Sequence, residues 1–370
     1  MSESNEYDHA YGAIIGVIIG DACGATLKTK IGGNITEQIA KNAMTYPGGG
    51  MFRLAQAQYT DCTELMLSLA SALTPNNPRY GFPTDDVAIS YINWIKSRPF
   101  NIEMVFYRAF SSYKTYDSNL GKTISQHMMD VSLIKNNNSE TNGALMRAIP
   151  IALWAFKESF TTIADLARQD AKLSHPSNVC QDCNAIYCMA QAYIIKYPYD
   201  SDGAIQMIEE YVINNPVNKR VHDWVLIDSK QIFTRLEGNF DSKQNMGSVK
   251  FPFVLSIYFL RNKTNFYDAI LKTLMLGGDT SANAAIVGGM MGSYWGNSKV
   301  PLELKLPVNN FDCTKIIIKN DIEYAMKYTV VPRNIYIGYN RPSIYSTVNL
   351  YKKINDLLGL PTNNDNPFIR

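Results

Sequence analysis

Glycines spaced four residues apart restrict what this chain can fold into. They recur in two predicted helices, spanning 10–27 and 280–296: Gly12, Gly16 and Gly20 in the first, and Gly288, Gly292 and Gly296 in the second. A glycine costs a helix about 1 kcal/mol relative to alanine, and close approach of a neighbouring backbone is the usual compensation. The spacing therefore predicts tight helix packing at the centre of the fold.

Apolar residues at three- and four-residue spacing predict helices along most of the chain. Besides the two glycine helices, the predicted segments are 60–74, 86–96, 101–112, 120–134, 142–157, 161–173, 178–196, 202–213, 249–261 and 264–276. Strand-like alternation is nearly absent, and no Gly/Ser- or Pro-rich linker divides the chain. We therefore expect an all-α fold with a single compact multi-helix domain over residues 10–300.

The pattern becomes less clear in residues 301–370, which we expect to form a C-terminal extension packed on the domain or appended to it. Segments 315–319 and 334–338 are compatible with extended structure, whereas 347–359 again has a helical pattern. The aromatic segment Tyr328 to Tyr345 either covers a cleft, binds a partner or packs on the surface, and surface packing is the favoured interpretation.

Composition excludes several classes of function. Apolar residues make up 46% of the 370 residues and charged residues 18%, which fits a globular protein with a core. The formal charge of +2 gives no excess of positive charge for binding a nucleic-acid backbone. The apolar run 13–20 is too short for a membrane span, and the polar start lacks the basic region of a signal peptide. We expect a soluble protein, cytoplasmic or otherwise intracellular.

The six cysteines are expected to be reduced thiols, because a chain of this length shows no dense pattern of pairs. Only Cys180 and Cys183 form a C-x-x-C, on one face of the helix 178–196. No second C-x-x-C or nearby histidine pair supports zinc binding there.

Acidic residues stand where two predicted helices begin. Thr60 and Asp61 precede the apolar run 65–73, and Asp279 precedes the helix 280–296. Each position is explained by an N-cap, which accepts hydrogen bonds from first-turn amides. The same oxygen-bearing side chains also suit a hard cation such as Mg²⁺. These residues alone leave both interpretations open.

Two further polar clusters suit a ligand or a purely structural role. The loop 139–147 contains Ser139, Asn142 and Gly143 ahead of a helix, and its amides suit an anion, although a capped helix start has the same composition. His175 stands alone in a Ser-His-Pro sequence, and such a histidine is more often a structural hydrogen-bond partner than a catalyst.

Together, and in this order, the clusters resemble the ADP-ribosylglycohydrolase family, in particular its dinitrogenase-reductase-activating glycohydrolase branch. The matching segments cover roughly residues 10 to 300: GVIIGDACGAT (16–26), GGGMFRLAQAQYTDCTELM (48–66), NGALMRAIPIA (142–152), SHPSNVCQDCNAIY (174–187) and GGDTSANAAIVGGMMGSYWG (277–296). The resemblance implies an all-α enzyme that hydrolyses the N- or O-glycosidic bond between ADP-ribose and a protein side chain or small acceptor, using two Mg²⁺ or Mn²⁺ ions. It implies ADP-ribose or an ADP-ribosylated protein as the partner.

The resemblance also assigns roles by position. It implies Thr60, Asp61 and Asp279 as metal ligands, with Asp61 and Asp279 as the catalytic candidates. Asp21 is expected to support the site without binding metal. The positions implied to bind the ligand are Gly49, Ser139, Asn142, Gly143 and His175.

This chain departs from the family pattern at the chemistry. Cys62 stands at the second aspartate of T-D-D-T, and Ser281 and Ala282 stand at the second aspartate and the threonine of G-G-D-x-D-T. Lys28 stands at the glutamate of G-D-A-L-G-x-x-x-E. Two remaining carboxylates support a pair of hard cations poorly, and a thiol is the wrong partner for Mg²⁺. We therefore expect at most one weakly bound ion.

Lys28 is expected either to point to solvent or to place its ammonium by Asp61 and Asp279, where it replaces part of the cation charge. Two functions follow. One is a working or weakened hydrolase with a degenerate dimetal site. The other is a pseudoenzyme that binds ADP-ribose or a related nucleotide without turnover, and the missing carboxylates favour it. A helical scaffold without a ligand is a third, less favoured interpretation.

Overall fold

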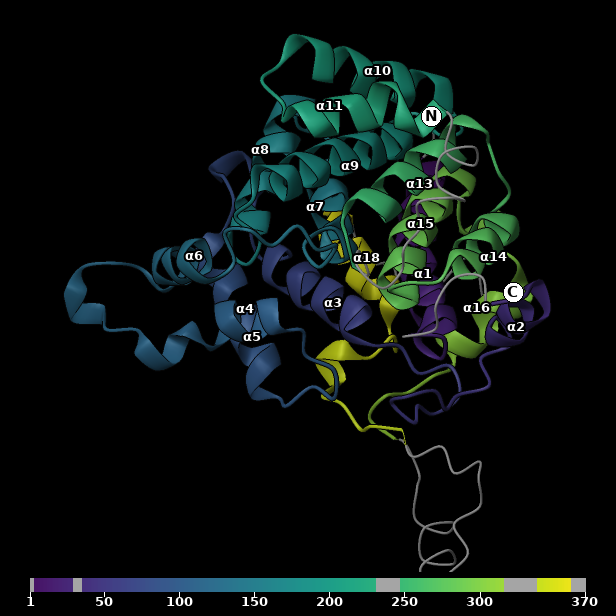
Figure 1. The fold of residues 1–370 in the computed structure, drawn as a ribbon, viewed down its shortest axis with the longest axis horizontal. Coiled ribbons are helices and arrows are strands. Elements are labelled where there is room, and N and C mark those ends of the chain that lie inside the picture. The colour runs from purple at the N-terminus through teal and green to yellow at the C-terminus, as the bar shows by residue number, and fades with distance from the viewer. Residues whose placement is uncertain (1–2, 29–34, 231–246, 316–337, 361–370) are drawn as a thin grey trace, which may run out of the picture.

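The computed structural model describes residues 3–28, 35–230, 247–315 and 338–360, and the regular elements in these ranges are helices (Figure 1). In chain order they are α1 (Glu3–Ala25), α2 (Glu37–Ala43), α3 (Asp61–Leu73), α4 (Thr84–Lys96), α5 (Met104–Phe110), α6 (Ile124–Lys135), α7 (Ile149–Trp154), α8 (Phe160–Lys172), α9 (Asn178–Lys196), α10 (Ser201–Asn214), α11 (Lys219–Leu226), α13 (Lys250–Arg261), α14 (Phe266–Leu276), α15 (Thr280–Trp295), α16 (Leu302–Asn309) and α18 (Leu350–Leu358). In the same ranges, β-structure is limited to two isolated bridges. The expected all-α class is confirmed. None of these helices is both long and apolar enough to cross a membrane.

The two glycine helices pack against each other at the centre, where the spacing predicts tight helix packing. α1 and α15 lie side by side inside the molecule, with α13 and α14 packed against α15 (Figure 1). A Cβ added at Gly16 would overlap the carbonyl oxygen of Gly288, and one added at Gly12 would overlap that of Gly292. The backbones therefore touch directly, which compensates for the low helix propensity of glycine.

The contact stripe differs from the prediction at both ends. It extends through Gly24, which faces the backbone of Thr280 on α15. At the other end, Gly296 lies beyond α15 as its C-cap with a φ of 75°, although its backbone still faces Gly12. A side chain there would meet the carboxylate of Asp8. Gly296 thus ends the helix, since glycine adopts this left-handed conformation without strain.

Most predicted helices are present, with differences at their boundaries. The first helix begins seven residues earlier than predicted, at Glu3, and the predicted helix 101–112 begins only at Met104, after the extended N-cap residue Glu103. The predicted helix 142–157 is a turn, then a 3-10 segment at Leu145–Arg147, then α7. The short helices α2, α11 and α16 were not predicted. The possible strands 315–319 and 334–338 lie almost entirely outside the described residues.

The described end of the C-terminal extension contributes to the core. Tyr345, Leu350, Ile354 and Leu358 are buried within the main apolar cluster. α18 packs against α1, α3 and α7. The first part of the aromatic segment, up to residue 337, lies outside the described residues. The division of the chain at residue 300 stays a prediction.

Candidate functional site

The start of α3 is held by a carboxylate from another helix. Asp21, fully buried in α1, accepts hydrogen bonds from the backbone nitrogens of Thr60 (2.8 Å) and Thr63 (3.0 Å). It also accepts from the hydroxyls of Thr60 (2.6 Å) and Thr63 (2.8 Å). Burial raises the pKa of Asp21 to about 6, although these hydrogen bonds oppose the rise. Asp21 thus takes the role of N-cap acceptor that Thr60 was predicted to play, and the Thr60 proton is already engaged.

Asp61 is the first residue of α3 and is buried. Its Oδ1 accepts a hydrogen bond from Asn101 Nδ2 at 2.7 Å. Its Oδ2 is also buried and has no hydrogen-bond partner among the described residues. Burial raises the pKa of this carboxyl, Lys28 lowers it, and the charge of nearby Asp279 raises it further. Asp61 therefore presents one unpartnered carboxylate oxygen beside a second carboxylate.

Asp279 stands at the N-cap position of α15 but makes no side-chain cap bond. Its Oδ1 accepts from Ser281 Oγ at 3.4 Å, and its Oδ2 accepts from Asn142 Nδ2 at 3.3 Å. Capping therefore does not account for this buried carboxylate. It is directed to the residues that the sequence singled out as a site.

Lys28 turns inward rather than to solvent. Its Nζ lies 3.3 Å from Asp279 Oδ1 and 3.9 Å from Glu103 Oε1. Burial lowers the pKa of Lys28, but the charges of Asp279, Asp61 and Glu103 outweigh it and hold the pKa well above its ordinary value. The ammonium thus pairs with Asp279, as one of the two alternatives expected, it also lies within ion-pair distance of Glu103, and the charge of Asp61 acts on it as well.

Sequence reasoning missed two residues of this cluster, Asn101 and Glu103. Both lie in the turn that was predicted as the start of a helix, and Glu103 is instead the N-cap residue of α5. Burial raises the pKa of Glu103 to about 8, the charge of Asp279 adds to the rise, and Lys28 opposes it. No periodic signal in the sequence marks these two residues.

The loop 139–147 reaches the same cluster through Asn142. Its side-chain nitrogen donates to Asp279 and, at 3.1 Å, to Asn283 Oδ1. Its backbone nitrogen donates to the carbonyl of Gly247 at 2.8 Å. The oxygens Asn142 Oδ1 and Ser139 Oγ are buried without a hydrogen-bond partner in the described part of the chain. They are acceptors that a ligand could use.

His175 lies behind this loop, with no exposed surface. Its Nδ1 is 2.8 Å from Ser174 Oγ, and its Nε2 is 2.8 Å from Thr141 Oγ1. Burial lowers the pKa of His175 well below its ordinary value, and the charge of Arg147 adds to this. A Cβ at Gly143 would overlap the ring of Phe106 and approach His175. These residues therefore shape the loop, and neither ring nitrogen of His175 is free for a ligand.

The cysteine pair also packs behind the loop. Cys180 and Cys183 are buried, and the Cys180 thiol lies 3.6 Å from the carbonyl oxygens of Ser139 and Thr141. Burial raises the pKa of both thiols, so that they stay protonated. A protonated thiol is a weak hydrogen-bond donor and no metal ligand.

Gly49 lies in a tight loop between α2 and α3. Its backbone exchanges two hydrogen bonds with Leu54, at 2.8 and 2.9 Å, and its φ is 82°. A cavity of about 520 Å³ borders this loop and is lined by Thr26 and Gly50 among others. Thr26 is two residues before Lys28, so the cavity and the carboxylate cluster are neighbours along the chain.

Comparison with known proteins identifies the family. The family model for ADP-ribosylglycohydrolase matches residues 2–329. The chain belongs to the ADP-ribosylglycohydrolase family. It is 25% identical over 306 residues to the ADP-ribosyl-dinitrogen reductase glycohydrolase of Rhodospirillum rubrum, covering 81% of this chain and 90% of that protein. It is 26% identical over 313 residues to the ADP-ribosylarginine hydrolase Tri1 of Serratia proteamaculans, covering 81% and 75%.

A solved structure shares the fold. The ADP-ribosylglycohydrolase-related protein complex contains a chain that matches with a TM-score of 0.63 and 20% identity, over 81% of this chain and 92% of that one. The structural comparison thus supports the same fold as the sequence comparison does.

The positions at which this chain departs from the family pattern add no negative charge. Cys62 is fully buried, and burial raises the pKa of its thiol well above the ordinary value. Ser281 is a neutral donor to Asp279, and Ala282 is buried and apolar. In the described ranges, no three His, Cys, Asp or Glu side chains are grouped so that they could hold a metal ion. With Lys28 beside Asp279, this donor set does not fit a pair of divalent cations.

Proposed function

We propose that this chain binds the ADP-ribosyl group of a modified protein or small acceptor and retains little or no metal-dependent hydrolysis. The binding site is formed by the starts of α3 and α15, the loop 139–147 and the turn 99–103. Membership of the family supports the ligand class. Relatives named for dinitrogen reductase and for ADP-ribosylarginine support a modified protein as its source.

The main observation in support of metal-independent binding is the position of the Lys28 ammonium, 3.3 Å from Asp279 Oδ1. At 4 Å and an effective dielectric constant of 20, two unit charges interact by about 4 kcal/mol, so a divalent cation would be repelled by roughly 8 kcal/mol. This repulsion cancels the attraction that one carboxylate exerts on the cation at the same distance. Of the attraction supplied by Asp61 and Asp279, only the equivalent of a single carboxylate is then left to hold a strongly hydrated ion.

The polar atoms without partners support binding of a hydroxyl-rich ligand. Asp61 Oδ2, Asn142 Oδ1 and Ser139 Oγ are buried acceptors, and Lys28 is a buried donor. A buried polar atom without a partner costs about 1–3 kcal/mol, which a ligand hydroxyl recovers when it donates to that atom. The hydroxyls of a ribose supply both donors and acceptors. Lys28 is thus proposed to orient the sugar through its own charge.

Calorimetric titration with ADP-ribose, with and without Mg²⁺, tests the proposal. The natural protein should bind ADP-ribose equally well in both conditions. A Cys62→Asp/Ser281→Asp/Lys28→Glu variant should become dependent on Mg²⁺, because it regains three carboxylates. Lys41→Glu, which reverses one charge on the exposed face of α2, is the control for the charge reversal that Lys28→Glu makes in the site. Tightening of ADP-ribose binding by Mg²⁺ in the natural protein would overturn the proposal.

The second candidate is a weakened hydrolase with one divalent ion. Glu103 favours it, because this carboxyl, which the family pattern did not predict, lies close enough to Asp279 and Asp61 for their charges to raise its pKa, although the three side chains are not grouped as metal ligands in the structure. Release of ADP-ribose from an ADP-ribosylarginine peptide, stimulated by Mg²⁺ or Mn²⁺ and abolished by a chelator, would put this candidate first. No release in either condition supports the binding function.

A further inference from the structure

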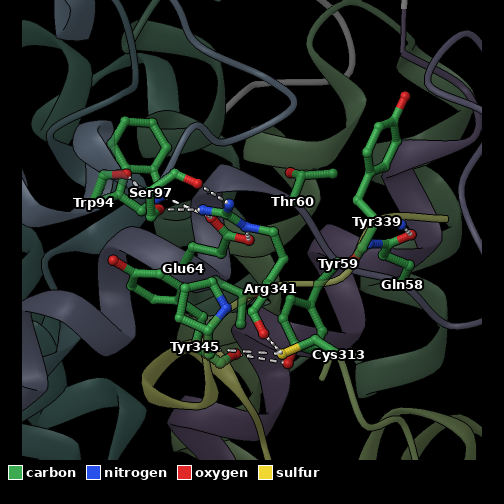
Figure 2. Close-up of polar contacts among 12 residues, drawn as sticks. Gln58, Tyr59, Thr60, Glu64, Trp94, Ser97, Cys313, Tyr339, Arg341 and Tyr345 are labelled. Carbon is green, nitrogen blue, oxygen red and sulfur yellow. Dashed lines mark hydrogen bonds and ion pairs between the residues drawn. The ribbon is translucent and has the colours of Figure 1, made fainter. Parts of the chain in front are cut away.

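The C-terminal extension inserts an arginine under the start of α3. Arg341 forms a bidentate ion pair with Glu64, with Nε to Oε1 at 2.6 Å and Nη2 to Oε2 at 2.9 Å (Figure 2). Both side chains are buried. Arg341 also donates to the carbonyl and the hydroxyl of Ser97, each at 2.8 Å, and Trp94 Nε1 donates to Glu64 at 2.7 Å. The guanidinium therefore joins α3 to the end of α4.

Residues just before Arg341 hold the two loops that lead into the site. Tyr339 exchanges hydrogen bonds between its backbone and the side chain of Gln58, at 3.1 and 2.9 Å (Figure 2). The backbone nitrogen of Gly338 donates to the carbonyl of Arg53 at 2.9 Å. The Tyr339 ring stacks on Phe100, with centroids 4.4 Å apart and planes inclined by 13°. One segment thus contacts both 53–58 and 97–100.

Both of these loops lead to Asp61, one along the chain and the other through a hydrogen bond from Asn101. Gln58 is followed by Tyr59 and Thr60, and Phe100 is followed by Asn101, which donates to Asp61 Oδ1. Tyr59 is itself tied to the same C-terminal segment, because its hydroxyl donates to the carbonyl of Tyr345 at 2.7 Å. A shift of either loop would change the position of Asn101 relative to the carboxylate.

We propose that residues 338–345, here called the C-terminal strap, position the candidate site. Tyr339 and Arg341 are the positioning residues: they keep Asn101 against Asp61 and leave Asp61 Oδ2 free for a ligand. Nothing in the family match extends to this segment, since the match ends at residue 329. The claim about loop geometry stands on the contacts alone, and its consequence for ligand affinity rests on the proposed function.

Tyr339→Leu is the most informative variant, because it removes the stacking on Phe100 and leaves the buried ion pair intact. Arg341→Lys keeps the charge but loses the two-pronged contact with Glu64. Arg168→Met is the matched control, since Arg168 forms an ion pair with Asp182 at 2.9 Å between α8 and α9, away from the strap. Two readouts apply: amide hydrogen exchange of segments 53–60 and 97–103, and the Kd for ADP-ribose, both at a temperature where every variant is folded.

For Tyr339→Leu we expect exchange in both segments to rise about fivefold or more, through local opening, and the Kd to rise about tenfold, through misplacement of the site. Arg341→Lys should shift both in the same direction, and Arg168→Met should shift neither. Unchanged exchange in Tyr339→Leu overturns the proposal. Raised exchange with an unchanged Kd also overturns it, because the strap is then only structural. If the natural protein fails to bind ADP-ribose, the proposed function fails, and exchange alone decides whether the strap holds the loops.

Discussion

At the scale of single residues, Lys28 determines the charge of the site. Its ammonium lies within ion-pair distance of Asp279 and Glu103, and the side chain is largely buried. The Lys28 ammonium is part of the chain and, unlike a bound metal ion, cannot dissociate. Its positive charge therefore faces the carboxylates at every metal concentration.

Lys28→Met should therefore create a response to divalent cations. Without the ammonium, Asp61 and Asp279 repel each other, and Mg²⁺ becomes the available counter-charge. We expect millimolar MgCl₂ to raise the Tm of this variant by several degrees, through binding to the folded state, and to leave the Tm of the natural protein unchanged. Differential scanning fluorimetry with and without MgCl₂ measures this. Lys41→Met is the matched control, and an equal shift in the control and Lys28→Met would contradict the prediction.

Glu103 should make stability fall as the pH rises. Its pKa is about 8 in the folded protein against an ordinary value of 4.5, so across this window the folded state holds a proton that the unfolded state has lost. The free energy of unfolding contributed by this group therefore decreases from about pH 4.5 to about pH 8. Glu103→Gln cannot titrate, so its stability relative to the natural protein should increase over the same range. Urea unfolding at several pH values checks this, and a constant difference between the two proteins would refute it.

The sequence predicts the members of the site better than their pairing. The residues alone left Asp61, Asn142 and Asp279 open to a structural interpretation, and only the resemblance to the family implied that they belong to one site. The sequence could not predict that Asn101 donates a hydrogen bond to Asp61, or that Lys28 lies within ion-pair distance of both Glu103 and Asp279. These contacts depend on the direction of side chains in a turn without regular periodicity.

At the scale of elements, the glycine spacing predicted tight helix packing at the centre, because close approach of a backbone is the usual reason for such a stripe, but it did not predict that α1 and α15 are each other's neighbours. The ends of the stripe were not predictable from spacing alone. Gly24 continues the contact on α1, whereas Gly296 has the same spacing as Gly292 but a left-handed φ. A four-residue spacing indicates which residues share a helix face, but it does not indicate where the helix ends.

Gly16→Ala tests the packing of α1 against α15 directly. Helix propensity alone favours alanine by about 1 kcal/mol, so any loss of stability must come from the contact with the Gly288 carbonyl. Because the obstacle is backbone in both helices, we expect a loss of about 3 kcal/mol or more in the free energy of unfolding. Gly203→Ala on α10 is the control, since its new methyl would meet only the side chains of Tyr193 and Asp200. Chemical denaturation gives both values, and a Gly16→Ala variant as stable as the natural protein would exclude direct backbone contact.

At the scale of the whole molecule, the chain closes on itself through a contact that no local pattern indicates. Arg341 and Glu64 are separated by 277 residues. Their side chains are charged, and a charged residue in a sequence is ordinarily assigned to the surface. The aromatic character of the segment up to Tyr345 favoured packing on the surface. The buried ion pair under α3, however, required knowledge of which surfaces meet.

This ion pair should show strong coupling between its two members. Arg341→Met leaves the Glu64 carboxylate buried without its counter-charge, and loss of one partner of a buried pair costs about 3–5 kcal/mol. Burial already raises the pKa of Glu64 against the opposing hydrogen bonds and charge of Arg341, so the unpaired carboxyl should become protonated.

The double variant Glu64→Gln/Arg341→Met removes both charges, and the amide oxygen introduced by Glu64→Gln can still accept from Trp94. We therefore expect the double variant to lose less stability than Arg341→Met alone. A double-mutant cycle by urea unfolding measures the coupling, for which we expect about 2 kcal/mol or more. Additive losses would mean that Arg341 acts through Ser97 and not through Glu64.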